Sequence, residues 1–483
     1  MEKKRSIGIN LIFNVIKSAL TVLFPLITLP YISSVLTQDS IGEYGFSTSI
    51  INYYLLISAL GIKTFAIKEA GKYKDDKNKF DEFASNMFSL NVFFTLVAYI
   101  LLGLSFFVFA KFRLYGKAIA IASFTICFST IGVEWIFNIV EDFAYITYRS
   151  VFVQIVSLII MFAFVRDASD AYIYMAISVI ANGGANIFNW FYARKYCHIR
   201  LRFSKEIFRD IVPIAIIFFN TLATIIYVNS DLTMLGWMAG PGETGAYTVA
   251  TKIYNTFKAV LNGIVPVFFA RLSLQYVGDR AEYERTFSYA ADFIACITIP
   301  MAIGGLLYGK EVILMLSTKE YLSAVSGMNL LLISLFFASM GYLYSSGAVL
   351  LAGKEKHMLV ATAIGAVANL CVNYALIPVY GNLGAAIGTL VTEVLVCSIL
   401  VATACKYNKI PVRLTNMLKC VVATIPFLAV YKLYSYVYRE GIYYYLIFVA
   451  FSAIIYYVVL LCLKHEVVLL ATERVMKKIK RFN

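Results

Sequence analysis

Long hydrophobic stretches recur along the whole chain, and they constrain its fold more than any other feature. Hydrophobic residues make up 60% of the 483 residues, charged residues only 14%, and the mean hydropathy is +0.77. A water-soluble domain cannot hide so much apolar surface. The sequence therefore predicts an all-α polytopic membrane protein, because a helix of about 20 apolar residues is long enough to cross a bilayer.

Fourteen segments have the length and composition of membrane-spanning helices. Turn-forming and charged residues separate them, as Gly240-Pro241-Gly242 does between the seventh and the eighth. The predicted spans cover residues 7–33, 41–67, 86–110, 117–138, 143–165, 170–193, 208–235, 244–270, 286–309, 322–351, 358–378, 383–404, 415–437 and 441–463.

Lys and Arg residues are distributed unevenly between the two sides of these spans. Of the 42, 30 lie on the same side as both chain ends and 8 on the opposite side. Cytoplasmic loops carry the excess of Lys and Arg, so both termini are predicted to be cytoplasmic in a plasma-membrane protein. The outer loop after the third span breaks the pattern, since it carries Lys111, Arg113 and Lys117.

The net charge of +14 is explained by this topology and by contact with anionic lipid, without nucleic-acid binding. The basic tail, residues 464–483, is predicted to lie on the inner membrane surface, with disorder as the alternative. No nucleotide-binding or hydrolase motif occurs, which argues against an enzyme. The eight scattered Cys residues are predicted to be core residues, and the three His residues suggest neither a metal site nor a cofactor.

A short motif occurs twice at an offset of 203 residues. Gly42-Glu43-Tyr44 opens the second span and Gly245-Ala246-Tyr247 opens the eighth, and Asn52 and Asn255 each follow the glycine by ten residues. An offset of about six helices preserves orientation, so the motif predicts a parallel repeat with two lobes related by an axis along the membrane normal. A chance match is the alternative.

Polar residues at helical spacing mark candidate functional faces. Asn14 and Lys17 share one face of the first span, and Asn255 and Lys258 share one face of the eighth. Such faces are expected to contact protein or water, and interhelical hydrogen bonding is the alternative role for the Asn residues. Lys17 and Lys258 are predicted to lie near mid-membrane, where each needs an acidic partner or an aqueous cavity with an anionic guest.

Five further charges fall inside predicted spans. Lys63 lies near an inner end, where it either snorkels or binds substrate. Lys252 and Asp231 share an outer depth and are predicted to form either a structural ion pair or part of the site. Glu134 is either an interface residue, anchored by the adjacent Trp, or an ion-coupling acid, and Glu393 either carries protons or has a structural role that includes meeting a Lys.

Several short motifs follow one another in an order typical of one family. They are residues 24–31 (FPLITLPY), 41–44 (IGEY), 132–137 (GVEWIF), 227–236 (YVNSDLTMLG), 245–247 (GAY), Asn369 to Asn373, 384–386 (GAA) and Glu393. Over residues 7–405 the chain thereby resembles the Wzx-type polysaccharide-unit (O-antigen) flippases. These form the polysaccharide transporter branch of the multidrug/oligosaccharidyl-lipid/polysaccharide exporter superfamily.

This resemblance implies a MATE-like fold with two six-helix lobes around a central cavity. The lobes would comprise residues 1–200 and 201–405. Residues 406–463 would add two helices, which in the related peptidoglycan-precursor flippases make a groove for the lipid tail. Many O-unit flippases have twelve helices, so the two extra helices depart from the family's pattern.

The resemblance also implies a function. The protein would move undecaprenyl-pyrophosphate-linked oligosaccharide units from the inner to the outer leaflet by alternating access, beside a polysaccharide polymerase and chain-length machinery. Lys17 and Lys258 would clamp the pyrophosphate, with Asn14 and Asn255 bonding phosphate or sugar. There are two alternatives. One is a multidrug or organic-cation antiporter of the same fold, and the other is a non-transporting scaffold of a polysaccharide-assembly complex.

Overall fold

The computed structural model describes residues 23–73, 76–202, 205–408, 410, 414–437 and 442–479. Within these ranges the secondary structure is helical and contains no strand. Twelve described segments are long and apolar enough to cross a membrane, and two shorter apolar helices, Leu23–Val35 and Gly116–Gly132, accompany them. The predicted all-α membrane fold is confirmed, and each predicted span corresponds to one of these segments, the first only from residue 23 onward.

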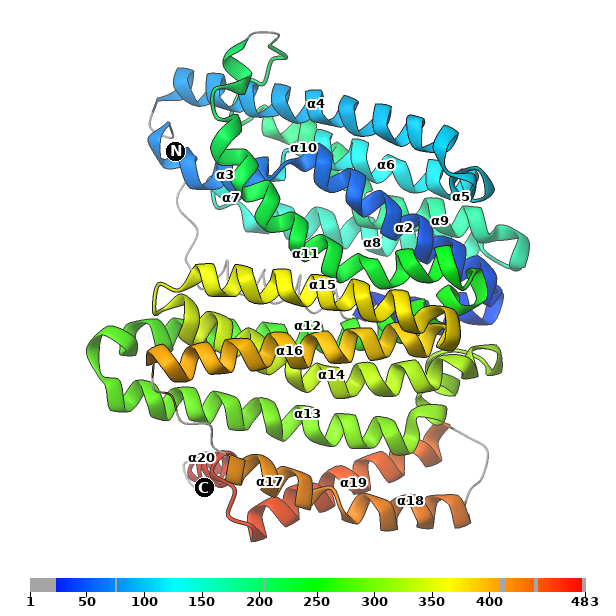
Figure 1. Ribbon diagram of the computed structural model, residues 1–483, viewed down its shortest axis with the longest axis vertical. Helices are drawn as coiled ribbons and strands as arrows, with labels where there is room; N and C mark the ends of the chain where they lie inside the picture. Colours follow the sequence, from blue (N-terminus) through cyan, green and yellow to red (C-terminus); the bar gives the residue numbers. More distant parts are fainter. Residues whose placement is uncertain are drawn as a thin grey trace. The chain divides into compact units, whose positions relative to one another are not determined.

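The chain divides into two compact units, of which the first comprises Met1–Thr248. Its helices alternate between long spans and short connecting turns (Figure 1). They are α2 (Gln38–Ala59), α3 (Ile62–Glu69), η1 (Ala70–Lys72), α4 (Lys77–Val108), α5 (Ala110–Leu114), α6 (Gly116–Gly132), α7 (Glu134–Ile139), α8 (Phe143–Phe164), η2 (Ala168–Asp170), α9 (Ala171–Val179), η3 (Ile180–Gly184), α10 (Asn186–Ala193), η4 (Lys205–Phe208), α11 (Ile211–Met238) and the start of α12 (Pro241–Gly278).

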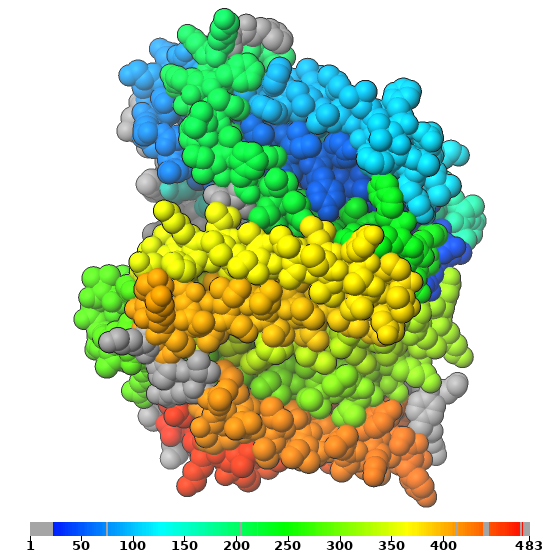
Figure 2. All heavy atoms as spheres, viewed as in Figure 1, coloured from blue at the N-terminus to red at the C-terminus, as the bar shows by residue number. Residues whose placement is uncertain are grey.

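The second unit comprises Val249–Asn483 and contains the rest of α12. Its further helices are α13 (Arg280–Leu316), η5 (Lys319–Ser323), α14 (Ala324–Tyr344), η6 (Ser345–Leu350), α15 (Glu355–Tyr380), α16 (Asn382–Asn408), α17 (Leu414–Ala423), α18 (Pro426–Val437), α19 (Ile442–Cys462) and α20 (Glu466–Ile479). In Figure 2, α15 in yellow and α16 in orange lie side by side on one face of this unit, and these two helices contact each other along their length.

The first compact unit extends through Thr248, past the predicted lobe boundary at residue 200, and the predicted lobes stay a prediction. Two contacts hold the intervening segment to this unit. Helix α11 packs along α2, and the first turn of α12 meets the start of α2, where Nε2 of Gln38 donates to the carbonyl oxygen of Gly242 at 2.7 Å. The seventh span and the first turns of the eighth therefore belong to the first unit.

Left-handed backbone positions interrupt two helices of the first unit. Leu60 (φ 45°) and Gly61 (φ 83°) separate α2 from α3, and Val133 (φ 35°) separates α6 from α7. A left-handed conformation costs a residue with a side chain about 1–2 kcal/mol, so packing must hold Val133 in place, and it is 2% exposed. The predicted single span 117–138 is thus two helices, and Glu134 lies at the N-terminal end of the second one.

The C-terminal helices α17 to α20 belong to the second unit and pack against α13 (Figure 1). Phe427 of α18 and Tyr456 of α19 are buried together with Val468 of α20, against apolar residues of α13 such as Ile303. The described part of the basic tail forms the helix α20, Glu466–Ile479. Its predicted contact with the inner membrane surface stays a prediction.

Candidate functional site

Lys258 and Glu393 form an ion pair within the second unit. Nζ of Lys258 on α12 lies 3.2 Å from Oε1 of Glu393 on α16. The same Nζ donates to Oη of Tyr254, one turn earlier in α12, at 3.0 Å. The Lys258 side chain is 29% exposed and that of Glu393 is 9% exposed. Both helices have the length and composition of membrane spans, where an uncompensated charge is costly.

In this structure the two charges compensate each other. Lys258 has the acidic partner that a lysine near mid-membrane needs, and Glu393 meets a Lys, its structural alternative. Whether substrate or a proton also binds here stays a prediction. Tyr254 was not among the predicted site residues, although its position four residues before Lys258 on one helical face is a signal that would have identified it.

Asn255 and Lys252 are the other predicted site residues of α12. Asn255 is exposed and lies three residues before Lys258, so the two side chains are neighbours on the helix surface. Lys252 is half-buried. It belongs to the second unit and Asp231 to the first, and the predicted pairing of these two residues stays a prediction.

Asp231 has a hydrogen-bond partner that the sequence did not indicate. Oη of Tyr247 donates to Oδ2 of Asp231 at 2.5 Å, and the two residues are 1% and 7% exposed. Tyr247 is the tyrosine of the repeated motif at the start of α12. Two residues before Asp231 in α11 lies Asn229, which accepts a hydrogen bond from Asn52 of α2 at 2.8 Å. Asn52 thus has the interhelical bonding role that was the alternative for the Asn residues.

Glu134 binds two cations in the first unit. Its Oε2 lies 2.9 Å from Nζ of Lys63, and its Oε1 lies 3.6 Å from Nη2 of Arg149. Lys63 comes from α3, Glu134 from the N-terminal end of α7 and Arg149 from α8. The adjacent Trp135 is 5% exposed and packs in the core of the first unit. The carboxylate joins three helices, and its predicted role in ion coupling stays a prediction.

Arg149 is the member of this group that the sequence analysis missed. Its side chain is 7% exposed, whereas that of Lys63 is 56% exposed. Nη1 of Arg149 donates to the carbonyl oxygen of Ala185 at 3.1 Å and to Oδ1 of Asn186 at 2.9 Å. A position near the inner end of a span gives no sequence signal for such burial, because the covering residues come from the distant segment around α10.

Lys17 and Asn14 lie outside the described residues. The predicted cavity that Lys17 would share with Lys258 therefore stays a prediction. The described part of the first span is the helix Leu23–Val35, which includes the motif residues Leu29 and Tyr31.

Comparison with known sequences places this chain among the polysaccharide biosynthesis proteins. The sequence model of the family described as polysaccharide biosynthesis protein matches residues 7–273, more than half of the chain. A protein of Escherichia coli (strain K12) with the name “Putative O-antigen transporter” is 24% identical over 413 residues, which cover 82% of this chain and 96% of that protein. A protein of the same name from Shigella dysenteriae is 22% identical over 385 residues, 77% of this chain and 94% of its own.

Solved structures share the fold. The inward closed conformation of the lipid II flippase MurJ superimposes with a TM-score of 0.72 at 15% identity, covering 93% of this chain and 97% of that one. The inward-facing conformation of a multidrug resistance MATE family transporter of the MOP superfamily gives a TM-score of 0.63 at 15% identity, covering 81% and 95%. The predicted MATE-like fold is therefore confirmed, and the family match confirms the predicted resemblance to polysaccharide transporters.

Proposed function

The chain belongs to the family of polysaccharide biosynthesis proteins, and we propose that it flips lipid-linked oligosaccharide units across the bacterial plasma membrane. The names of its two relatives and the flippase fold it shares with MurJ support this assignment. The guest that we propose is an oligosaccharide on undecaprenyl pyrophosphate, moved from the inner to the outer leaflet for surface-polysaccharide synthesis. A charged pyrophosphate cannot cross hydrocarbon unaided, so the protein must supply a polar path with cations.

The observation that carries this proposal is the pair of Lys258 with Glu393. Lys258 is a membrane-span cation whose side chain is 29% exposed and whose counter-charge comes from another helix, 135 residues away. A cation held in this way can exchange its carboxylate for a phosphate oxygen without ever being left unpaired. The exposed Asn255 on the same face adds a hydrogen-bonding group for phosphate or sugar.

In this proposal the same exchange also drives the conformational change of the transport cycle. When a phosphate takes the place of Glu393 at Lys258, the buried carboxylate needs a new counter-charge, either a proton or another cation. A ligand shifts a conformational equilibrium only by its different affinity for the two states. We propose that Lys17 and Asn14 complete the anion site in one state, and that Lys63 and Lys252 are further substrate contacts.

Two energy sources are compatible with this scheme. The membrane potential contributes about 2.3 kcal/mol per charge per 100 mV, and an inside-negative potential favours moving an anion outward. Exchange with protons at Glu393, Asp231 or Glu134 is the other. The two differ in whether a carboxylate is required.

The test is complementation of a bacterial strain that lacks its own polysaccharide-unit flippase. We expect the wild-type chain to restore surface polysaccharide and to remove the accumulated lipid-linked intermediate. Lys258→Ala should abolish both effects at normal expression, and Lys258→Arg should retain part of them because the charge survives. Lys310→Ala is the matched control, since Lys310 is an exposed lysine of the same unit that makes no ion pair among the described residues.

The result also separates the alternative functions. Export of organic cations without clearance of the lipid-linked intermediate would contradict the flippase assignment in favour of an antiporter. If Lys258→Ala and Lys258→Glu both restore surface polysaccharide, no anion site is needed at this position. This is the result expected for a scaffold.

A further inference from the structure

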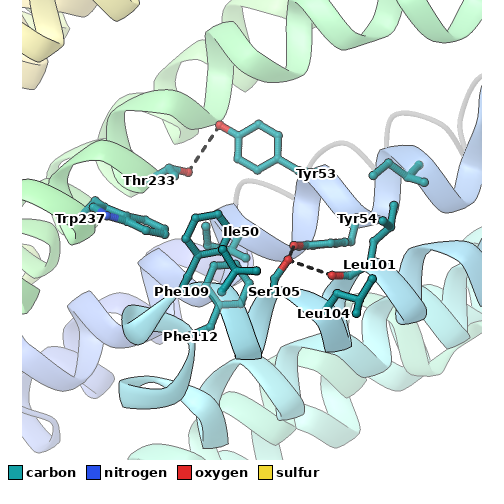
Figure 3. A pocket seen from close by; sticks show the side chains of 12 residues that line it. Ile50, Tyr53, Tyr54, Leu101, Leu104, Ser105, Phe109, Phe112, Thr233 and Trp237 are labelled. Atoms are coloured by element: carbon teal, nitrogen blue, oxygen red, sulfur yellow. Dashed lines mark hydrogen bonds between the residues drawn. The ribbon is translucent and has the colours of Figure 1, made fainter.

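A cavity in the first unit lies among α2, α4, α5 and α11 (Figure 3). Its volume is about 480 Å³, and five aromatic residues form much of its wall: Tyr53, Tyr54, Phe109, Phe112 and Trp237. The ring of Phe109 lies 5.5 Å from that of Phe112 and 5.4 Å from that of Trp237, measured between centroids. These rings contact one another and make a continuous apolar wall, as Figure 3 shows.

The hydroxyl groups of Tyr54, Ser105 and Thr233 along this wall are already paired within the protein. Oη of Tyr54 lies 2.6 Å from Oγ of Ser105, which in turn donates to the carbonyl oxygen of Leu101 at 2.8 Å. Oγ1 of Thr233 donates to Oγ of Ser49 at 3.0 Å. Hydroxyl groups that are satisfied internally need no polar ligand, so the cavity suits a hydrocarbon guest.

The rim of the cavity continues onto the lipid-facing surface of α4. Leu104 and Val108 line the cavity and are also 54% and 70% exposed. Phe107, between them on the same helix, is 82% exposed. Exposed apolar side chains on a membrane-spanning helix face lipid chains, so a chain can enter this cavity sideways from the bilayer.

The cationic loop of Lys111, Arg113 and Lys117 follows this wall directly in the sequence. Lys111 and Arg113 flank the cavity residue Phe112, and none of the three cations forms an ion pair with a carboxylate of the described part of the chain. Burial raises the pKa of Tyr115, which lies between Arg113 and Lys117 in the sequence, and the nearby acids Glu43 and Asp39 raise it further. The loop is also the exception to the predicted excess of cations on the cytoplasmic side.

We propose that this cavity binds the polyprenyl chain of the carried lipid, with the lipid phosphate against the cationic loop. This inference rests on the proposed function, which supplies the lipid. A polyprenyl phosphate carries one chain on its phosphate, whereas a phospholipid carries two, and one cavity beside one cationic loop matches the single chain. The loop lies at the predicted outer end of α4, so the site receives the lipid after its headgroup has crossed.

The site is tested with the full-length protein in nanodiscs of phosphatidylethanolamine. A photoreactive polyprenyl monophosphate is the probe, and the labelled peptides are mapped by mass spectrometry. We expect labelling in residues 101–114 and 233–237 that excess undecaprenyl phosphate displaces and phosphatidylglycerol does not. Equal displacement by phosphatidylglycerol would mean a general lipid contact only, and labelling confined to α17–α19 would place the chain elsewhere; either result overturns the proposal.

Two pairs of variants make the test specific. Leu104→Trp fills the cavity and should weaken displacement by undecaprenyl phosphate about tenfold, the change expected from losing the burial of about two methylene groups. Leu96→Trp, on the exposed face of the same helix but outside the cavity, should change nothing. Lys111→Gln with Lys117→Gln should weaken displacement about threefold to tenfold, whereas Lys310→Gln with Lys319→Gln should not.

Failure of this site and failure of the proposed function give different results. A wild-type chain that complements the flippase-deficient strain, yet shows no labelling in residues 101–114 or 233–237, refutes the cavity site and leaves the flippase assignment intact. A wild-type chain that fails to clear the lipid-linked intermediate refutes the flippase assignment, whatever the labelling.

Discussion

Gly42 of α2 and Gly245 of α12 each pack against the backbone of the other's helix. A methyl group on Gly42 would lie 1.9 Å from the carbonyl oxygen of Pro241, and one on Gly245 would lie 2.0 Å from the carbonyl oxygen of Gln38. Residues 38 and 241, like residues 42 and 245, are 203 positions apart. The contact is therefore reciprocal at the offset of the sequence repeat, which supports the interpretation of the two motifs as equivalent positions.

Gly42→Ala and Gly245→Ala should each lower stability, because the methyl group would collide with backbone that no side-chain rotation can clear. We expect a loss of about 1–3 kcal/mol, the usual cost of overpacking. Thermal unfolding of the purified protein in detergent measures it. Gly103→Ala is the control, since a methyl group there meets no atom within 4 Å, and alanine favours a helix. Equal melting temperatures for all three variants would contradict the close packing.

Removing one partner of the Lys258–Glu393 pair should cost more than removing both. A buried pair broken on one side leaves an uncompensated charge, which destabilises by about 3–5 kcal/mol. We expect Lys258→Met and Glu393→Gln each to reduce thermal stability, and the double variant to regain most of it. Transport should stay low in the double variant because the cation is missing. Additive losses of stability would show that the two groups do not interact.

Glu393→Gln also separates the two energy sources. If protons drive transport through this carboxylate, the variant in proteoliposomes should lose the response to an imposed pH gradient and keep the response to an imposed potential. Substrate binding to Lys258 should remain, because the cation is unchanged. An undiminished response to the pH gradient would remove Glu393 from the coupling path and leave the potential acting on the anionic guest as the simpler account.

Arg149 and Lys63 bind the same carboxylate, yet their replacement should have unequal effects. Lys63 is 56% exposed, and an exposed ion pair contributes about 0–1 kcal/mol, so Lys63→Met should be nearly neutral for stability. Arg149→Met should cost about 1–3 kcal/mol, because it leaves the buried carbonyl of Ala185 and Oδ1 of Asn186 without their donor, while Glu134 keeps Lys63. Arg149→Lys should rescue little, since a single ammonium cannot match the guanidinium's several donors. Thermal unfolding compares the three variants.

Asp231 offers a test between two partners. If Tyr247 satisfies it, Tyr247→Phe should destabilise by about 1–3 kcal/mol through the unpaired carboxylate oxygen. If Lys252 also pairs with it, Asp231→Asn should damage the protein and Lys252→Met in the same chain should partly restore it. Thermal stability and complementation are measured for the single and double variants. Additive damage in Asp231→Asn with Lys252→Met would rule out the pairing and leave Tyr247 as the partner that matters.

Most of the fold could be predicted from the sequence, because the signal for a membrane span is local. The spans around α4, α8 and α16 agree with the structure to within about three turns of helix. The Tyr-rich segment 441–463 forms the long apolar helix α19, whereas segment 415–437 forms two shorter helices, α17 and α18. Hydropathy is a property of about 20 consecutive residues and does not depend on what packs beside them. The break at Val133 escaped prediction because its backbone conformation is imposed by the packing around it.

The candidate site also has some features that the sequence determines and others that depend on the tertiary structure. The sequence by itself determined that Lys258 and Glu393 are membrane-span charges in need of compensation, because burying a charge in hydrocarbon costs free energy whatever the fold. Only the tertiary structure decided that they compensate each other, that Tyr247 bonds Asp231, and that Arg149 is buried against Glu134. Each of these partners depends on how a helix is rotated about its axis and which neighbour it meets, and this is set by the packing of residues far apart in the chain.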